Sequence, residues 1–213
     1  MEASTASIKG LWQDYLKVRE RIEKRIEEFI RTGREASEQE LFAELVFCLL
    51  TPQSKARLCW ESVEKLKEAG LLLEGRAEDI AELLRGVRFR RNKARYIVEA
   101  RRFAGRLRQL LQGFPSAEKA RLWFVKNIKG MGWKEASHFL RNVGKGLELA
   151  ILDRHILKNL VLFRVIDGVP ASLSGRRYIE IERRMKDFSR KVDIPLSHLD
   201  LLFWFRQTGE IFK

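Results

Sequence analysis

Apolar residues recur along almost the whole chain at the spacing of a single helix face. The first run extends from residue 8 to residue 30, and Gly33 after it predicts the end of that helix. Ser37 and Glu40 then have the spacing of a capping box, which predicts the start of a strongly apolar second helix. Ser197, as an N-cap residue, predicts the start of a last helix. Between these, the pattern predicts further helices over 60–66, 80–84, 94–110, 122–125, 154–163 and 174–192.

One stretch, LELAILDRHIL at residues 147–157, also fits a strand, but the sequence offers it no partner strands. The expected fold class is therefore all-α, with many short helices and no β domain. A chain of 213 residues suits one compact unit or two small lobes. No linker rich in proline, glycine or serine separates two halves, so any two lobes must share helices or pack tightly.

The charge of the chain indicates a partner. The sequence has 42 Lys and Arg against 29 Asp and Glu, a net charge of +13. Abundant charge of both signs is typical of proteins from heat-loving organisms, but the excess of one sign favours a polyanion. No apolar run is long enough to span a membrane, so we expect no membrane partner and a cytoplasmic location. Cys48 and Cys59 lie in helical apolar patterns and are expected to be buried thiols, without a metal or cofactor.

Residues 128–140 read IKGMGWKEASHFL, which predicts a helix, a tight turn and a second helix. Gly130 and Gly132 permit a positive φ and a close approach of the backbone, while Met131 between them packs into the core. Unpaired N–H groups at the start of the second helix, together with the helix dipole, favour an anion. Together with the net positive charge, this leads us to expect Gly130, Met131, Gly132 and Lys129 to contact a nucleic-acid phosphate. The alternative is a glycine-rich helix connection that binds no ligand.

Lys134 stands in the first turn of the second predicted helix, and Asp153 follows in the segment AILDRHIL. This order resembles the helix-hairpin-helix motif of the DNA glycosylase superfamily that includes endonuclease III. The resemblance implies a bifunctional enzyme in which the Lys134 amine attacks C1′ of the sugar and forms a Schiff base, after which β-elimination nicks the strand. It also implies that Asp153 stabilises the cationic sugar as the base departs. The alternatives are a phosphate contact for Lys134 and a helix N-cap for Asp153.

The remaining motifs narrow this resemblance. Endonuclease III and the adenine-mismatch enzymes usually carry a four-cysteine iron–sulfur cluster after the aspartate, whereas this chain has no cysteine after Cys59. The segments LLTPQSKA (49–56), GVRFRRNKARYI (86–97) and HLDLLFWFRQTGEIFK (198–213) resemble the archaeal-type 8-oxoguanine DNA glycosylase/AP lyase family, also found in some thermophilic bacteria. That family resemblance implies that Trp204 stacks on the extruded base and that the terminal carboxylate of Lys213 reaches the purine edge. Core packing of Trp204 and a frayed tail are the alternatives.

An extruded base leaves a gap in the duplex that the protein must fill. Gln53 matches the position of a DNA-inserting glutamine in endonuclease III, and Phe89 suits a wedge loop flanked by phosphate contacts. The basic residues around Phe89 are Arg88, Arg90, Arg91, Lys93 and Arg95. Their crowding around one aromatic residue favours DNA contact over a solvated helix face.

These observations predict a two-lobe, all-α helix-hairpin-helix glycosylase. One lobe is expected to be a helical barrel of residues 36–134 that ends in the hairpin, and the other to combine residues 1–35 with 135–213. The expected substrate is double-stranded DNA containing 8-oxoguanine, and the expected state is a monomer. Two alternatives are an enzyme for oxidised pyrimidines and a non-catalytic DNA-binding module.

Overall fold

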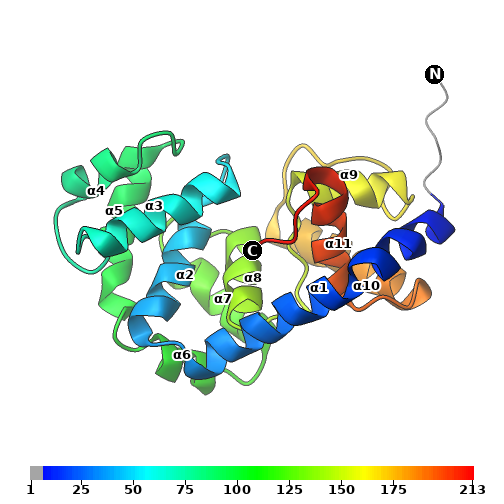
Figure 1. Cartoon of the computed structure of the whole chain (residues 1–213), viewed down its shortest axis with the longest axis horizontal. Coiled ribbons are helices and arrows are strands. Elements are labelled where there is room, and N and C mark those ends of the chain that lie inside the picture. The colour runs from blue at the N-terminus through cyan, green and yellow to red at the C-terminus, as the bar shows by residue number, and fades with distance from the viewer. Residues whose placement is uncertain (1–6) are drawn as a thin grey trace. The chain divides into compact units, whose positions relative to one another are not determined.

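The computed structural model describes residues 7–213, and all of its regular elements are helices (Figure 1). Within that range no strand occurs, so the all-α prediction is confirmed, and the stretch before Asp153 is irregular. Residues 1–6, part of one predicted lobe, lie outside the described range. The helices are α1 (Ile8–Glu35), α2 (Glu38–Leu50), α3 (Ala56–Glu68), α4 (Ala77–Leu83), α5 (Arg90–Ala100), the 3-10 turn η1 (Arg101–Phe103), α6 (Leu107–Gly113), α7 (Ala117–Asn127), α8 (Trp133–Asn142), α9 (Arg154–Leu162), α10 (Gly175–Lys191) and α11 (Leu196–Thr208).

The chain forms two compact units, one of Ile30–Gly146 and one of Met1–Phe29 with Leu147–Lys213. We call the first the hairpin unit and the second the terminal unit. The sequence-based division placed the boundaries after residues 35 and 134. In the structure the second helix of the hairpin, α8, belongs wholly to the hairpin unit, because it packs against α2 and α7 (Figure 1).

Helix α2 is the centre of the hairpin unit. Its start is the predicted capping box, in which the Ser37 hydroxyl accepts from the Glu40 N–H and the Glu40 carboxylate accepts from the Ser37 N–H. Every residue from Leu41 to Leu50 is buried, and α3, α5, α6 and α8 pack around the helix. Burial of each large apolar side chain stabilises the fold by about 1.5–3 kcal/mol. Both cysteines are buried thiols outside any disulfide, as expected.

Gly33 does not end the first helix, because α1 continues to Glu35. A Cβ atom at Gly33 would lie 2.0 Å from the carbonyl oxygen of Val143, at the end of α8. The glycine is therefore required for a close approach of two backbone segments, and its prediction as a helix stop was wrong.

The single helix predicted over residues 94–110 is divided into α5, η1 and α6. The Arg101 side chain donates to backbone carbonyls of the 71–75 loop, including that of Leu72 at 3.2 Å. The Glu38 carboxylate accepts from the first N–H groups of α6, those of Leu107 and Arg108, at 2.8 and 3.0 Å. The Glu38 carboxylate thus pairs with backbone amides that the start of a helix leaves without intrahelical partners, and α6 begins at this point as a separate helix.

Ser197 lies inside α11, whose N-cap is Pro195, so its predicted capping role was wrong. Gly209 does close α11, with φ of 75°. Among the helices of the described residues, none combines the length and the apolar character that crossing a membrane demands.

Candidate functional site

The hairpin consists of α7, a turn and α8. Gly130 in the turn has φ of 84°, and a Cβ atom there would lie 2.2 Å from the Tyr96 ring. Gly132 has φ of −88°, which any residue adopts, so only one of the two glycines uses a positive φ. Met131 is buried beneath the turn, as the sequence predicted, and so is Ile128. The conformation of the turn therefore depends on Gly130 above all.

An open hollow of about 590 Å³ lies against this turn, lined by Arg102 and by residues 125–132. The Gly130 N–H has no hydrogen-bonding partner in the described part of the chain. Arg102, Lys126 and Lys129 supply positive charge to the lining. Lys129 is exposed and pairs with Glu99 at 3.0 Å, a surface contact that a phosphate can replace. An unpaired amide and basic side chains around an open hollow are suited to a phosphate group.

Replacing Gly130 by alanine is expected to weaken both folding and DNA binding. The alanine would adopt a left-handed backbone, and its Cβ would collide with the Tyr96 ring, so we expect a loss of about 1–3 kcal/mol of unfolding free energy. The displaced turn would also lower the affinity for duplex DNA. Thermal unfolding and fluorescence anisotropy measure the two effects. Gly105→Ala is the matched control, because nothing lies within 4 Å of its Cβ position; equal behaviour of both variants would contradict the prediction.

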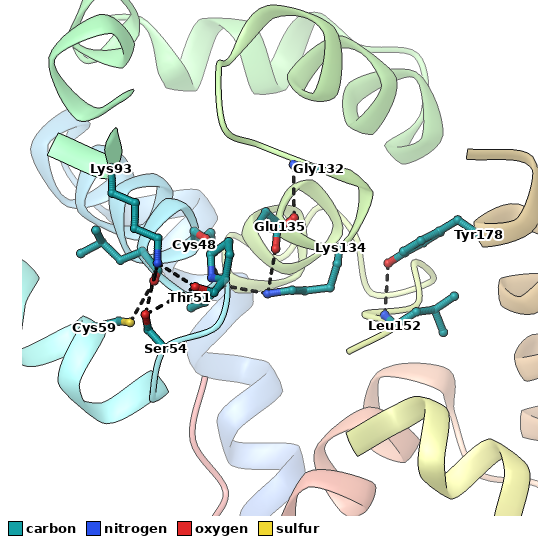
Figure 2. A network of polar contacts seen from close by, with 12 residues as sticks. Cys48, Thr51, Ser54, Cys59, Lys93, Gly132, Lys134, Glu135, Leu152 and Tyr178 are labelled. Carbon is teal, nitrogen blue, oxygen red and sulfur yellow. Dashed lines mark hydrogen bonds and ion pairs between the residues drawn. The ribbon is translucent and has the colours of Figure 1, made fainter. Parts of the chain in front are cut away.

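The Lys134 amine is held by two acceptors at the start of α8 (Figure 2). Its Nζ donates to Thr51 Oγ1 at 3.0 Å and pairs with Glu135 Oε1 at 3.0 Å. The other Glu135 oxygen accepts from the Gly132 N–H at 3.2 Å, so the carboxylate also caps α8. Only 20% of the Lys134 side chain is exposed. The amine is therefore fixed in a largely buried place.

The direction of the Thr51 hydrogen bonds matters for chemistry. Thr51 Oγ1 donates its one proton to the Cys48 carbonyl at 2.9 Å, so toward Lys134 it can only accept. The Glu135 carboxylate is likewise an acceptor. A lysine amine attacks an electrophile only after it has lost a proton, and its two remaining N–H bonds can then stay with these two acceptors while its lone pair is available for attack. Sequence reasoning missed both partners; Glu135, three residues after the N-cap Gly132, matches the spacing of a capping box.

Asp153 belongs to the terminal unit, where it is the N-cap of α9. Its Oδ1 accepts from the Ile156 N–H at 2.8 Å. Its Oδ2 has no hydrogen-bonding partner among residues 7–213. The capping role that the sequence offered as an alternative is therefore real, and the cap fixes the carboxylate while one oxygen stays available.

The segment before Asp153 is anchored by α10. The Tyr178 hydroxyl donates to the Ala150 carbonyl at 2.7 Å. It also accepts from the Leu152 N–H at 3.1 Å (Figure 2). Glu182 accepts from the Ala150 N–H at 2.8 Å. All of these bonds are buried, so each is costly to lose and the chain that leads to Asp153 is rigidly placed.

Gln53 and Phe89, the two predicted DNA-inserting residues, share an unusual backbone. Both are exposed and left-handed, with φ of 55° and 58°. The Ser54 hydroxyl accepts from the Arg88 N–H at 3.0 Å and so joins the two loops. The Arg88 guanidinium lies 5.0 Å from the centre of the Phe89 ring. An exposed large apolar residue on a strained turn among cations is consistent with contact to a polyanion.

The basic residues near Phe89 differ in their environments. Arg88, Arg91 and Arg95 are exposed, whereas Arg90 is partly buried and donates to the Ala81 carbonyl. Lys93 is only 4% exposed, and its amine is used within the protein. The prediction that Lys93 contacts DNA was therefore wrong. The face of α5 that carries Lys93 packs toward α2, which the run of basic letters did not reveal.

In the terminal unit, Trp204 is partly buried and meets His155 edge to face, with ring centres 5.2 Å apart. The indole Nε1 is buried and has no hydrogen-bonding partner in the described residues. At the end of the chain Phe212 is buried and Lys213 is partly buried. The tail therefore docks on the protein, and a frayed tail was the wrong alternative.

The chain is similar in sequence to 8-oxoguanine DNA glycosylases. A family model described as 8-oxoguanine DNA glycosylase matches residues 22–194. An 8-oxoguanine DNA glycosylase/AP lyase of Fusobacterium nucleatum is 43% identical over 204 residues, covering 93% of this chain and 94% of the relative. One of Methanocaldococcus jannaschii is 41% identical over 198 residues, covering 92% of this chain and 93% of the relative.

Solved structures agree with the sequence relatives. The 8-oxoguanine DNA glycosylase of Thermotoga maritima is similar, with a TM-score of 0.88, 35% identity, and coverage of 97% of this chain and 98% of that chain. The M. jannaschii glycosylase/lyase in complex with DNA that contains 8-oxoguanine gives a TM-score of 0.89, 39% identity, and coverage of 97% and 99%.

Proposed function

Because the chain belongs to the helix-hairpin-helix family of 8-oxoguanine DNA glycosylases, we propose that it removes 8-oxoguanine from double-stranded DNA and then nicks the strand. The observation that carries the proposal is the position of the Lys134 amine at the start of α8, where both of its hydrogen-bonding partners, the Thr51 hydroxyl and the Glu135 carboxylate, act as acceptors. We propose that it acts as a monomer on the DNA of a prokaryotic cytoplasm. The proposed catalytic residues are Lys134, which belongs to the hairpin unit, and Asp153, which belongs to the terminal unit.

Lys134 is the proposed nucleophile. Its neutral amine forms a bond from Nζ to C1′ as the bond from C1′ to the base breaks, and the base leaves with the bonding electron pair and takes up the proton that Nζ loses. The bond from C1′ to O4′ then breaks, which opens the sugar ring to a Schiff base on Nζ while O4′ takes a proton from solvent. Loss of a proton from C2′ and departure of the 3′ phosphate complete β-elimination and nick the strand. Covalent attack by an amine makes this second cut possible, because the iminium withdraws electrons from C2′.

Asp153 is the proposed electrostatic partner of the sugar. As the base departs, positive charge develops on the sugar ring, and a fixed carboxylate lowers the energy of that state. Its cap to Ile156 would hold Oδ1 while Oδ2 faces the developing charge. The hydrogen bonds of Tyr178 and Glu182 to the preceding segment support this role, since they limit its movement.

The remaining site residues are assigned to DNA and to the base. Gly130, Met131, Gly132 and Lys129 form the proposed phosphate contact, and Gln53, Phe89, Arg88, Arg90 and Arg91 the proposed contact around the gap left by the base. Trp204 would stack on the extruded purine. The C-terminal carboxylate of Lys213 would accept from its edge. In 8-oxoguanine N7 is a donor, so a buried acceptor there rejects guanine, whose N7 would remain unpaired.

Borohydride trapping on defined duplexes tests the proposal. The protein is incubated with duplexes that contain 8-oxoguanine, thymine glycol or undamaged guanine, then reduced and digested for peptide mass mapping. We expect a covalent adduct on the 8-oxoguanine duplex, with the added mass on Lys134. A faster reaction at thymine glycol would favour the enzyme for oxidised pyrimidines. Tight binding without any adduct or base release would favour the non-catalytic module.

A further inference from the structure

The buried ammonium of Lys93 contacts the turn that contains Thr51, whose hydroxyl accepts a hydrogen bond from the Lys134 amine (Figure 2). We propose that Lys93 is a positioning residue for base excision, which sets the place of the Lys134 amine through the turn of residues 50–54. The inference rests on the proposed function of Lys134. It concerns a residue with no route to DNA, because its side chain is 4% exposed and its contacts are internal.

Every donor of the Lys93 ammonium has an acceptor in this turn. Its Nζ lies 2.7 Å from the Leu50 carbonyl, 2.7 Å from the Pro52 carbonyl and 3.2 Å from Ser54 Oγ. An ammonium has three N–H bonds, so this set uses all of them. Because its acceptors lie on both sides of Thr51, the cation fixes the backbone on which the Thr51 hydroxyl stands.

The turn needs such a group because its own backbone is irregular. Helix α2 ends at Leu50, so its last carbonyl groups lack the N–H groups of a following helical turn as partners. Gln53 adopts a left-handed backbone conformation, which is strained for a residue other than glycine. Burial lowers the pKa of the Lys93 ammonium to about 8, so the charged form still dominates at pH 7. The free-energy cost of burying this charge is offset by the three charge-assisted hydrogen bonds that order the turn.

A short path joins Lys93 to the reacting amine. Lys93 holds Leu50 and Pro52, Thr51 lies between them, and Thr51 Oγ1 accepts from Lys134 Nζ at 3.0 Å. A shift of the turn would displace that acceptor and the amine with it. A displacement of about 1 Å at a reacting group lowers a rate by about 100-fold, so a remote cation can affect the chemical step.

A purely structural role for Lys93 predicts a different outcome, and Arg101 provides the control. Arg101 also uses a cation, in its case a partly buried one, to hold backbone carbonyls of an irregular loop, residues 71–75 of the same unit. Its loop has no contact with Lys134 among the described residues. Lys93→Met and Arg101→Met should therefore both lower the melting temperature, but only Lys93→Met should slow base excision.

The decisive measurement is a double-mutant cycle on the single-turnover rate, with enzyme in excess over an 8-oxoguanine duplex. We expect Lys93→Met to lower this rate by about 100-fold even at saturating enzyme, where a change in DNA affinity does not limit the rate. Thr51→Val should slow the same step. Because Lys93→Met and Thr51→Val both disturb the hydrogen bond between Thr51 and Lys134, the double variant should be no slower than the slower of the two single variants.

The results that overturn the inference are specific. They are a rate for Lys93→Met equal to wild type, multiplicative losses in the double variant, or an equal slowing by Arg101→Met. If Lys93→Met does not fold, Ser54→Ala replaces it in the cycle, because it removes one acceptor of the ammonium; an unchanged rate there also overturns the inference. Inert wild-type protein would instead contradict the proposed function, so the two failures are distinguishable.

Discussion

Lys134→Gln is expected to abolish the borohydride-trapped adduct on an 8-oxoguanine duplex and to stop strand nicking. Glutamine has no amine to form a Schiff base, so no substitute route to the covalent intermediate exists at this position. The amide can still bond with Thr51, and the fold should be retained. Gel analysis of reduced reactions measures the adduct, and anisotropy measures whether the variant still binds the duplex.

Lys129→Gln is the matched control for this variant. Lys129 belongs to the same hairpin, but its side chain is exposed and pairs with Glu99. We expect it to weaken DNA binding modestly, because one phosphate contact contributes little alone, and to leave trapping intact at saturating protein. Retained trapping in Lys134→Gln would exclude Lys134 as the nucleophile.

Asp153→Asn is expected to slow base release by about 100-fold or more while leaving DNA affinity largely unchanged. Asparagine keeps the oxygen that caps α9 but removes the charge, so the local structure should be retained. Single-turnover base release on the 8-oxoguanine duplex measures the chemical step, and thermal unfolding checks that the cap persists.

Ser174→Ala separates loss of a cap from loss of a charge. Ser174 caps α10 in the same unit by accepting from the Arg177 N–H. Its removal should cost about 1 kcal/mol of stability without slowing base release. If Asp153→Asn released the base at the wild-type rate, Asp153 would be only a helix cap.

The sequence predicted the features that depend on neighbours along the chain. The capping box at Ser37, the closure of α11 at Gly209 and the turn at Gly130 each follow from a few adjacent residues, and the structure contains all three. The periodicity of apolar residues was likewise sufficient for the fold class. Patterns of this kind can be read from the sequence because the residues that form the cap or the turn are neighbours along the chain.

The features that the sequence did not predict depend on contacts between distant segments. Thr51 and Lys134 are separated by 83 positions, so no local pattern could pair them. Lys93 looked like part of a surface basic run, but the packing of α5 turns it inward. Gly33 resembled a helix stop, but the approach of Val143 determines its role.

The hydrogen bond from Arg88 to Ser54 joins the Gln53 turn to the Phe89 loop before any DNA arrives. Both residues already have their left-handed backbones, so neither loop must be ordered on encounter with a duplex. Two loops that are already ordered lose little conformational entropy when they bind. If Gln53 and Phe89 contact DNA as proposed, a surface preset in this way would meet one base pair after another without a loop-ordering step at each.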